Sequence, residues 1–170
     1  MAKTTKKIKS PTKTKLRKKA DSVFSTFIRL RDSNKQWVVT CPLCWSKLPR
    51  KQAQNMHFIK RSCWFYRYNE QNCNAWCYRC NVILNWNYIE YTRWMQKKYG
   101  IEYVDNMISE SKKLHKERNK ADYQEIINNY STKIIQLAAR LTAQVRLFYF
   151  SFYHHETYLT KWKNANSTES

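Results

Sequence analysis

Residues 41–44 read CPLC and residues 77–80 read CYRC, and these two CxxC motifs decide the fold class of the chain. A CxxC turn directs two sulfur atoms toward one point, and two such turns supply the tetrahedral set of thiolates that zinc prefers. The 32 residues between the motifs leave room for an inserted hairpin. A shell of four sulfurs has no open position for a substrate, so the ion stabilises the fold. The predicted zinc ligands are Cys41, Cys44, Cys77 and Cys80.

The remaining two cysteines, Cys63 and Cys73, lie between the motifs without forming a CxxC pair. We expect buried or free thiols, with replacement of a zinc ligand as the alternative. The N-terminus lacks the apolar centre of a secretory signal, and no stretch is apolar over about eighteen residues. We therefore expect a cytoplasmic protein that does not enter a membrane, in which cysteines bind metal rather than form disulfides.

The charge of the chain is strongly one-sided. Lysine and arginine total 32 against 12 acidic residues, which gives a formal net charge of +20. Such an excess repels itself unless a polyanion neutralises it, and DNA or RNA is the obvious polyanion. A basic protein of the membrane surface is the alternative, but it requires an amphipathic anchor or a lipidation signal, and neither is evident.

The pattern along the chain predicts an α+β fold in four parts. Residues 1–20 form a disordered basic arm, 21–100 a zinc-stabilised domain, 101–150 a C-terminal helical hairpin and 151–170 an aromatic and then polar tail. Within this order we expect helices at 20–31, 87–99, 104–116 and 121–149, and extended segments at 36–40 and 55–59. Gly100, the only glycine, marks the end of a helix.

The last predicted helix carries an apolar stripe at steps of three and four residues, which needs a partner. The preceding helix or a second copy of the chain could supply it. The aromatic segment 147–153 is apolar on every side, so it is either docked or an interaction surface. The residues of the stripe are Tyr123, Ile127, Tyr130, Ile134, Leu137, Leu141, Val145 and Phe148.

A histidine and two asparagines occur in the middle of the chain in an order that is typical of one class of nuclease. His57 precedes Asn72, and Asn81 directly follows the second CxxC motif. This order resembles the HNH, or ββα-metal, nucleases. The sequence motifs around these residues resemble those of the NinG family, also called Rap, of phage recombination endonucleases. The resemblance covers roughly residues 23–141. Its strings are HFIxR at 57–61, RYxExN at 67–72, CxxCN at 77–81, NYIEY at 87–91 and YG at 99–100.

The resemblance implies an HNH-like core that cuts branched or junction DNA. His57 would act as the general base, and Asn72 would brace the loop that orients it. Magnesium or manganese would neutralise the scissile phosphate, with Asn81 as a ligand and Glu70 as a further candidate ligand. Candidate contacts with nucleic acid are Lys60, Arg61, Trp64, Arg67 and Arg93.

The chain also departs from the family pattern. Residues 54–56 read QNM where related sites carry aspartate, and Asn69 replaces another acidic residue. Neutral oxygens alone hold a divalent ion weakly. Two hypotheses follow, an active endonuclease and a weak or inactive HNH-derived DNA-binding protein that acts through a protein partner. An RNA-binding zinc protein is a third, but it does not explain the histidine and the two asparagines together.

The many aromatic residues allow two interpretations. They could stack on unpaired bases, or they could form a core covered by the stems of lysine and arginine. We expect core positions for Trp37, Tyr91 and Trp94. We expect exposure for three tryptophans in loop-like sequence. These are Trp64, Trp76 and Trp86. Trp76 and Trp86 among them stand where the family pattern has a glutamine and a glycine.

Overall fold

The computed structural model describes residues 10–83 and 88–166, and the side chains of its last helix as far as residue 143. The fold is α+β, with two small antiparallel hairpins among helices. Residues 84–87, which include Trp86, lie outside the described part. The elements are α1 (Lys13–Arg31), β1 (Val38–Thr40), β2 (Lys47–Pro49), η1 (Arg50–Gln52), β3 (Gln54–His57), β4 (Cys73–Trp76), η2 (Arg79–Ile83), α2 (Tyr88–Tyr99), α3 (Ile101–Ser111) and α4 (Lys120–Asn166).

Helix α1 begins earlier than the apolar pattern predicted. The hydroxyl of Thr12 accepts a hydrogen bond from the Lys15 N–H at 3.3 Å, which caps the helix at Lys13 instead of Ala20. Residues 13–20 are therefore helical and not part of a disordered arm. The C-terminal end is fixed by Asp32, whose carboxylate accepts the backbone N–H of Ala75 in β4 at 2.7 Å. This bond joins α1 to the second hairpin.

The two hairpins carry the two CxxC motifs in different places. Strands β1 and β2 pair with Val39 opposite Leu48, and they carry the first CxxC motif between them. Strands β3 and β4 pair with His57 opposite Cys73, and the second motif follows β4 directly. The 32-residue interval between the motifs thus contains a hairpin, as predicted from its length.

The β3–β4 hairpin separates two apolar cores. Its alternating side chains place Cys73 and Ala75 in a core with α1 and α4, and Met56 and Trp76 in a core with α2 and α3. Both sides of β4 are buried along its whole length. The hairpin is therefore held from two faces, which makes it a rigid base for functional groups.

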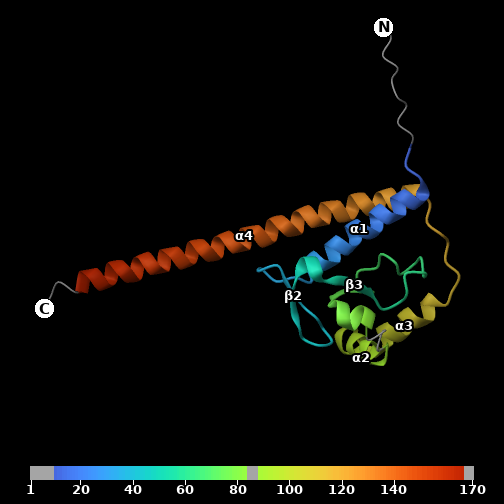
Figure 1. The fold of residues 1–170 in the computed structure, drawn as a ribbon, viewed down its shortest axis with the longest axis horizontal. Helices are drawn as coiled ribbons and strands as arrows, with labels where there is room; N and C mark the ends of the chain where they lie inside the picture. The colour runs from blue at the N-terminus through green and yellow to red at the C-terminus, as the bar shows by residue number, and fades with distance from the viewer. Residues whose placement is uncertain (1–9, 84–87, 167–170) are drawn as a thin grey trace, which may run out of the picture.

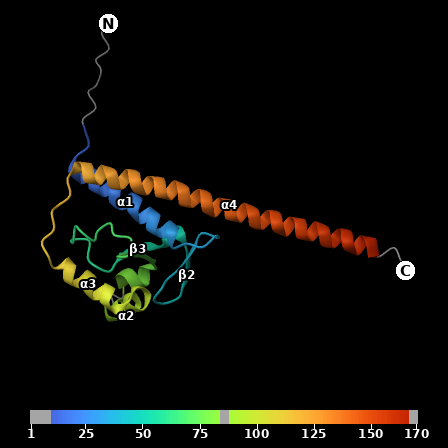
Figure 2. The ribbon, with the colours of Figure 1, turned by 180° about the vertical axis from the view of Figure 1, so that it is seen from behind.

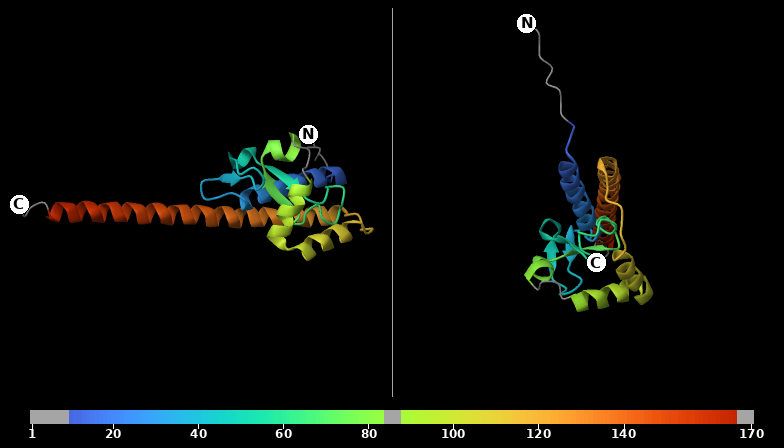
Figure 3. Two further views of the ribbon diagram at one scale, coloured as in Figure 1. Left: turned by 90° about the horizontal axis from the view of Figure 1, so that it is seen from below. Right: turned by 90° about the vertical axis from the view of Figure 1, so that its right-hand side faces the viewer.

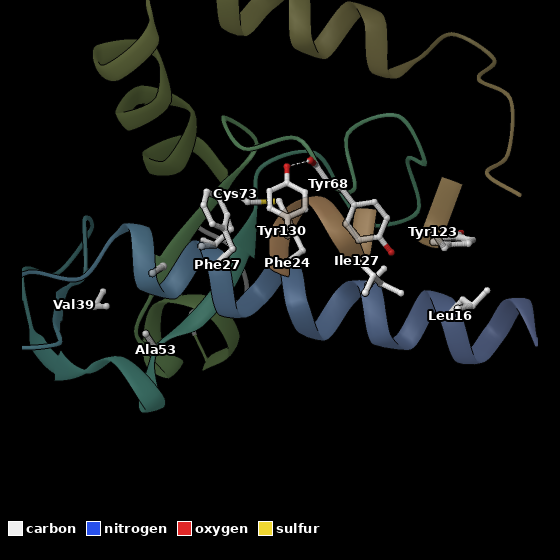
Figure 4. Packing of buried hydrophobic residues seen from close by; sticks show 13 residues of the cluster. Leu16, Phe24, Phe27, Val39, Ala53, Tyr68, Cys73, Tyr123, Ile127 and Tyr130 are labelled. Carbon is white, nitrogen blue, oxygen red and sulfur yellow. Dashed lines mark hydrogen bonds between the residues drawn. The ribbon is translucent and has the colours of Figure 1, made fainter. Parts of the chain in front are cut away.

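Helix α4 packs against α1, from the opposite end of the sequence (Figures 1 and 2). The contact is aromatic: Tyr130 lies edge-on to Phe24 at 4.8 Å between ring centroids, and its hydroxyl donates to the Tyr68 carbonyl at 3.1 Å (Figure 4). The predicted C-terminal helical hairpin is therefore wrong. Helix α4 pairs with α1 and α3 pairs with α2, because each helix buries its apolar stripe on a different face of the β3–β4 hairpin.

The end of α4 projects far beyond the rest of the molecule (Figure 3). Its first turn is fixed by a reciprocal cap, in which Asn119 accepts the Asp122 N–H at 3.1 Å and Asp122 accepts the Asn119 N–H at 2.7 Å. Tyr123, Ile127 and Tyr130 of the apolar stripe are buried against α1. The structure does not describe the side chains beyond residue 143, so the predictions for Val145, Phe148 and the aromatic segment 147–153 lie outside the described part.

Gly100 joins α2 to α3 at the helix end that the sequence predicted, with a positive φ of 93° that glycine tolerates. Its N–H completes α2 by donating to the Gln96 carbonyl at 2.8 Å. Helix α3 then starts at Ile101, three residues before the predicted start, and ends at Ser111 instead of residue 116. In residues 10–83 and 88–166, no helix combines the length and apolar character needed to cross a bilayer.

Candidate metal centre and active-site pocket

The four cysteines of the CxxC motifs converge on one point, as their spacing predicted. Their sulfur atoms all lie within 4.8 Å of one another, close enough to hold a metal ion such as zinc. The Sγ atoms of Cys44 and Cys77 are 3.6 Å apart. Backbone bonds shape each turn: Trp45 N–H donates to the Cys41 carbonyl at 2.9 Å, and Cys80 N–H points at the Cys77 sulfur at 3.4 Å.

The surroundings of the four sulfurs differ. The Ser46 hydroxyl, 3.0 Å from the Cys44 sulfur, lowers the pKa of this exposed thiol to about 6. Burial raises the pKa of Cys41 and of Cys80 above the usual thiol range. Buried thiols lose their protons only when a cation offsets the loss of solvation, so this set fits a thiolate-bound metal.

Cys63 and Cys73 do not join the cluster. Cys73 is fully buried beside Ala75 in the core under α1, where burial raises its pKa. Cys63 is half-buried, with its sulfur 3.9 Å from the Ser111 carbonyl at the end of α3. Replacement of a ligand is therefore wrong for both, and they are free thiols in the described structure.

A second site lies on the α1 side of the β3–β4 hairpin. A pocket of about 300 Å³ opens between α1, β3 and η2, and it brings together residues far apart in the sequence. Its polar lining combines His57 and Asn81 of the predicted set with arginines and a carboxylate. These groups are Asp21, Arg29, Asn55, His57, Arg61 and Asn81.

His57 ends β3 with its ring 7% exposed. Its Nε2 lies 3.1 Å from the Arg67 carbonyl, and the backbone of Asn55 also hydrogen-bonds the ring. Because the Arg67 carbonyl can only accept, the tautomer that satisfies it carries the proton on Nε2. The lone pair then resides on Nδ1. Burial, together with the positive charge of Arg61, lowers the pKa of His57 to about 4. The imidazole is therefore neutral at pH 7.

Asn72 holds the loop that follows β3. Its side-chain oxygen accepts the Ile59 N–H at 2.6 Å, and its amide donates at 3.0 Å to the carbonyls of Ile59 and Tyr66. Its own carbonyl accepts the Phe58 N–H at 2.8 Å. Asn72 is fully buried, so it lies behind the loop and does not line the pocket. This geometry matches the bracing role that the resemblance implied.

The oxygen atoms of Asn55 and Asn81 are the candidate ligands for a hard cation. The Asn81 amide nitrogen donates to the Gln54 side chain at 2.5 Å, which turns its oxygen to the other side. The Asn55 side-chain oxygen is buried and has no hydrogen-bond partner among the described residues. Both residues line the pocket, and an unpartnered buried oxygen beside an amide fits a divalent ion whose remaining ligands are anionic phosphate oxygens.

Two residues were missed by the sequence analysis. Asp21 comes from α1, where it was hidden among apolar positions, and its carboxylate accepts Arg67 at 2.7 and 2.8 Å and the Tyr68 hydroxyl at 2.8 Å. Burial opposes ionisation, but these bonds outweigh it and hold the pKa of Asp21 below its usual value. Asn55 was noted only as a departure from aspartate. No local pattern marks either residue, because the packing of α1 on β3 creates the pocket.

Several predicted site residues lie elsewhere. Glu70 does not line the pocket; its carboxylate bonds Lys133 of α4 at 2.6 Å. Arg93 is exposed on α2 and pairs with Glu90 at 2.9 Å. Arg67 donates to Asp21 through Nε and Nη2 and to the Arg61 carbonyl through Nη1, so it positions the loop instead of presenting a free fork to phosphate. Arg61 lines the pocket, and with Lys60 it also lines a wider groove toward α2.

The aromatic predictions are mixed. Tyr91 is buried as expected, and Trp94 packs half-buried against the same core. Trp76 is 1% exposed, so its predicted exposure is wrong: it follows the inward face of β4. Trp37 was expected in the core but is 37% exposed. Trp64 is half-buried between the guanidinium groups of Arg17 and Arg67, 5.8 and 5.7 Å from its ring.

The model of one protein family, described as the bacteriophage lambda NinG protein, matches residues 1–140. This match covers most of the chain. The chain belongs to the NinG family. The NinG match includes the basic N-terminal residues and ends before the aromatic segment, so the end of α4 lies outside the shared region. No curated protein and no solved structure is significantly similar to the chain.

Proposed function

We propose that this NinG-family chain is a metal-dependent endonuclease that cuts branched or junction DNA during phage recombination. The observation that carries the proposal is the pocket in which a buried neutral imidazole, His57, faces amide oxygens and arginines. Hydrolysis of a phosphodiester needs a base for the attacking water and positive charge for the phosphate. The pocket offers both kinds of group within one cavity.

The local fold supports an HNH assignment. Strands β3 and β4 are followed directly by η2, which gives the order strand, strand, helix. His57 ends the first strand, Asn72 lies in the connecting loop and Asn81 lies on the short helix. These are the positions that the resemblance to ββα-metal nucleases assigns to the base, the bracing residue and a metal ligand.

Each side chain has a defined task in this proposal. His57 accepts the proton of the attacking water at Nδ1, while the Arg67 carbonyl fixes the opposite nitrogen at 3.1 Å. Asp21 positions Arg67 through two hydrogen bonds, and Arg61 contacts the phosphate that flanks the cleaved bond. Asn55 and Asn81 would hold magnesium or manganese, which when bound withdraws negative charge from the phosphate.

DNA as the partner rests on the charge of the chain. The formal net charge of +20 favours a polyanion, and Lys60 and Arg61 extend the positive surface from the pocket along the adjoining groove. Asp21 is the only carboxylate that lines the pocket among the described residues, so phosphate meets little repulsion there.

A second candidate function is DNA binding without cleavage, through an inactive HNH site and a protein partner. It is favoured by the carboxylate shortage, since Asp21 is already paired with Arg67 and Glu70 with Lys133. A cation held without a free carboxylate depends on the substrate for its anionic ligands.

The test is cleavage of a labelled four-way junction, a flap and a plain duplex by zinc-loaded protein, with magnesium, manganese or no added ion. We expect metal-dependent nicking of the branched substrates, lowered roughly 100-fold or more by His57→Ala. His115→Ala is the matched control, because His115 stacks on Phe65 at 4.5 Å and does not line the pocket.

One outcome would count against the nuclease and one against its assigned base. Tight binding of branched DNA without cleavage under every ion supports the second candidate. Cleavage that survives in His57→Ala rules out His57 as the base.

A further inference from the structure

Trp45 is an aromatic residue in an unfavourable position. It directly follows Cys44 at the tip of the β1–β2 hairpin, its φ is +61°, and 74% of the residue is exposed. The left-handed region suits glycine and disfavours residues with a side chain. Exposure of an indole ring also forgoes the gain from burial. Within the described part of the chain, the Trp45 ring stacks on no other ring and on no cation.

Trp37 provides an internal comparison. It has the same φ of +61°, but the guanidinium of Arg50 covers its ring at 5.0 Å, and only 37% of the residue is exposed. The fold therefore uses the Trp37 side chain for packing. No such internal contact accounts for a large aromatic ring at Trp45, where a glycine would satisfy the backbone with less strain.

A second exposed aromatic residue, Tyr78, occupies the equivalent place beside a neighbouring cysteine. Tyr78 directly follows Cys77, whose sulfur is 3.6 Å from that of Cys44, and it is 54% exposed. The two aromatic residues are thus attached beside two neighbouring ligands of the four-cysteine cluster. A metal bound there would fix both backbone segments, so the rings would project from a rigid base.

The charge around these rings selects the partner. Residues 33–69 contain seven lysines and arginines and no acidic residue, and residues 71–89 also lack acidic residues. Lys47, three residues after the first CxxC motif, and Arg79, inside the second motif, are both exposed. A partner for this surface must combine flat apolar faces with negative charge. Unpaired nucleotides have both features, whereas the bases of an intact duplex are stacked on one another.

We propose that Trp45 and Tyr78 form a stacking surface for unpaired bases of DNA, which lets the chain distinguish branched or single-stranded DNA from duplex. The part of this inference that concerns selection of the substrate for cleavage rests on the proposed endonuclease function. Its test measures binding without added magnesium or manganese, so its outcome does not depend on cleavage.

The decisive variant is Trp45→Gly. Glycine accepts a φ of +61° without strain, so we expect the variant to keep its fold and its zinc. A loss of DNA affinity in this variant therefore measures the contribution of the Trp45 ring. We expect binding of a single-stranded oligonucleotide and of a flap to weaken about 5- to 100-fold, in keeping with the loss of one base–aromatic stack. Binding of a duplex of equal length should change by less than about twofold, because phosphate contacts carry it.

Trp37→Gly is the matched control, since it changes the same residue type at the same φ. It should leave the ratio of single-strand to duplex affinity unchanged, and Tyr78→Ala should lower that ratio in the same direction as Trp45→Gly. The inference is overturned if Trp45→Gly leaves single-strand affinity unchanged, or if it weakens single-strand and duplex binding equally. A Trp45-dependent preference for unpaired DNA without any cleavage would uphold this inference while removing the endonuclease.

Discussion

The four-cysteine cluster and the His57 pocket both adjoin the β3–β4 hairpin but are built in opposite ways. The cluster draws its ligands from two four-residue motifs, and its donors are thiols that become anionic when they bind metal. The pocket draws on α1, β3, the following loop and η2, and its donors are neutral oxygens, an imidazole and arginines. The four cysteines alone could complete a tetrahedral metal site, whereas the proposed cation in the pocket would need anionic oxygens from a substrate.

The largest effect should come from the cluster. Removal of zinc by a chelator, or Cys80→Ser, should unfold the centre of the chain, because structural zinc contributes roughly 10–16 kcal/mol to small domains. Circular dichroism and metal analysis check this prediction. Cys63→Ser is the control, since Cys63 lies outside the cluster and should leave one zinc ion per chain. A chain that stays folded after chelation would contradict the structural role of the metal.

The second effect concerns the loop behind the pocket. Asn72→Ala leaves the Ile59 N–H and the carbonyls of Ile59 and Tyr66 buried without partners. We expect the free energy of unfolding to fall by about 3 kcal/mol or more. Urea denaturation measures it, and Asn106→Ala, on the exposed face of α3, should change stability by less than about 0.5 kcal/mol. Equal stability of the two variants would remove the bracing role.

The third effect is a pH dependence that comes from His57. Its pKa is about 4 in the folded chain, below the ordinary value of 6.5, so the unfolded chain binds more protons between these values. Stability is therefore complete above about pH 6.5 and declines as the pH falls toward 4, by on the order of 2 kcal/mol at pH 5.

Denaturation of wild type and His57→Gln at pH 7 and at pH 5 isolates this contribution, because zinc ligands titrate alike in both proteins. The difference in stability between pH 7 and pH 5 should be smaller in His57→Gln. A wild-type His57 whose ring titrates near pH 6.5 in an NMR experiment would contradict the burial argument.

The smallest effect compares two arginines. Arg61→Ala should lower cleavage and reduce the slope of log affinity against log salt by about 1, the loss of one phosphate contact. Arg93→Ala should alter cleavage little, because Arg93 lies on α2 and pairs with Glu90. The reverse order of effects would place the DNA over α2 and away from the pocket.

The same contrast explains what the sequence could predict. The convergence of the four cysteines and the positive φ of Gly100 at a helix end follow from local spacing, and both agree with the sequence analysis. The strand predicted at residues 55–59 runs from Gln54 to His57, so its existence was predicted but not its ends. The pairing of α4 with α1 was not predicted, because an apolar stripe such as that of Tyr123 and Ile127 does not identify its partner. The pocket was half-predicted: His57 and Asn81 were named, whereas Asp21 enters through a helix more than thirty positions before His57.

The central claim is that the two sites are separate, with zinc at the cysteines and a second cation in the pocket. The most direct measurement is NMR line broadening by manganese in zinc-loaded protein, recorded with a short branched DNA bound. The account predicts that, as manganese is added, the signals of Asn55, His57 and Asn81 are lost first, before those of Cys63 and Glu70. Broadening that begins around Glu70 and Lys133, or none at all in residues 54–57 and 81, would contradict it.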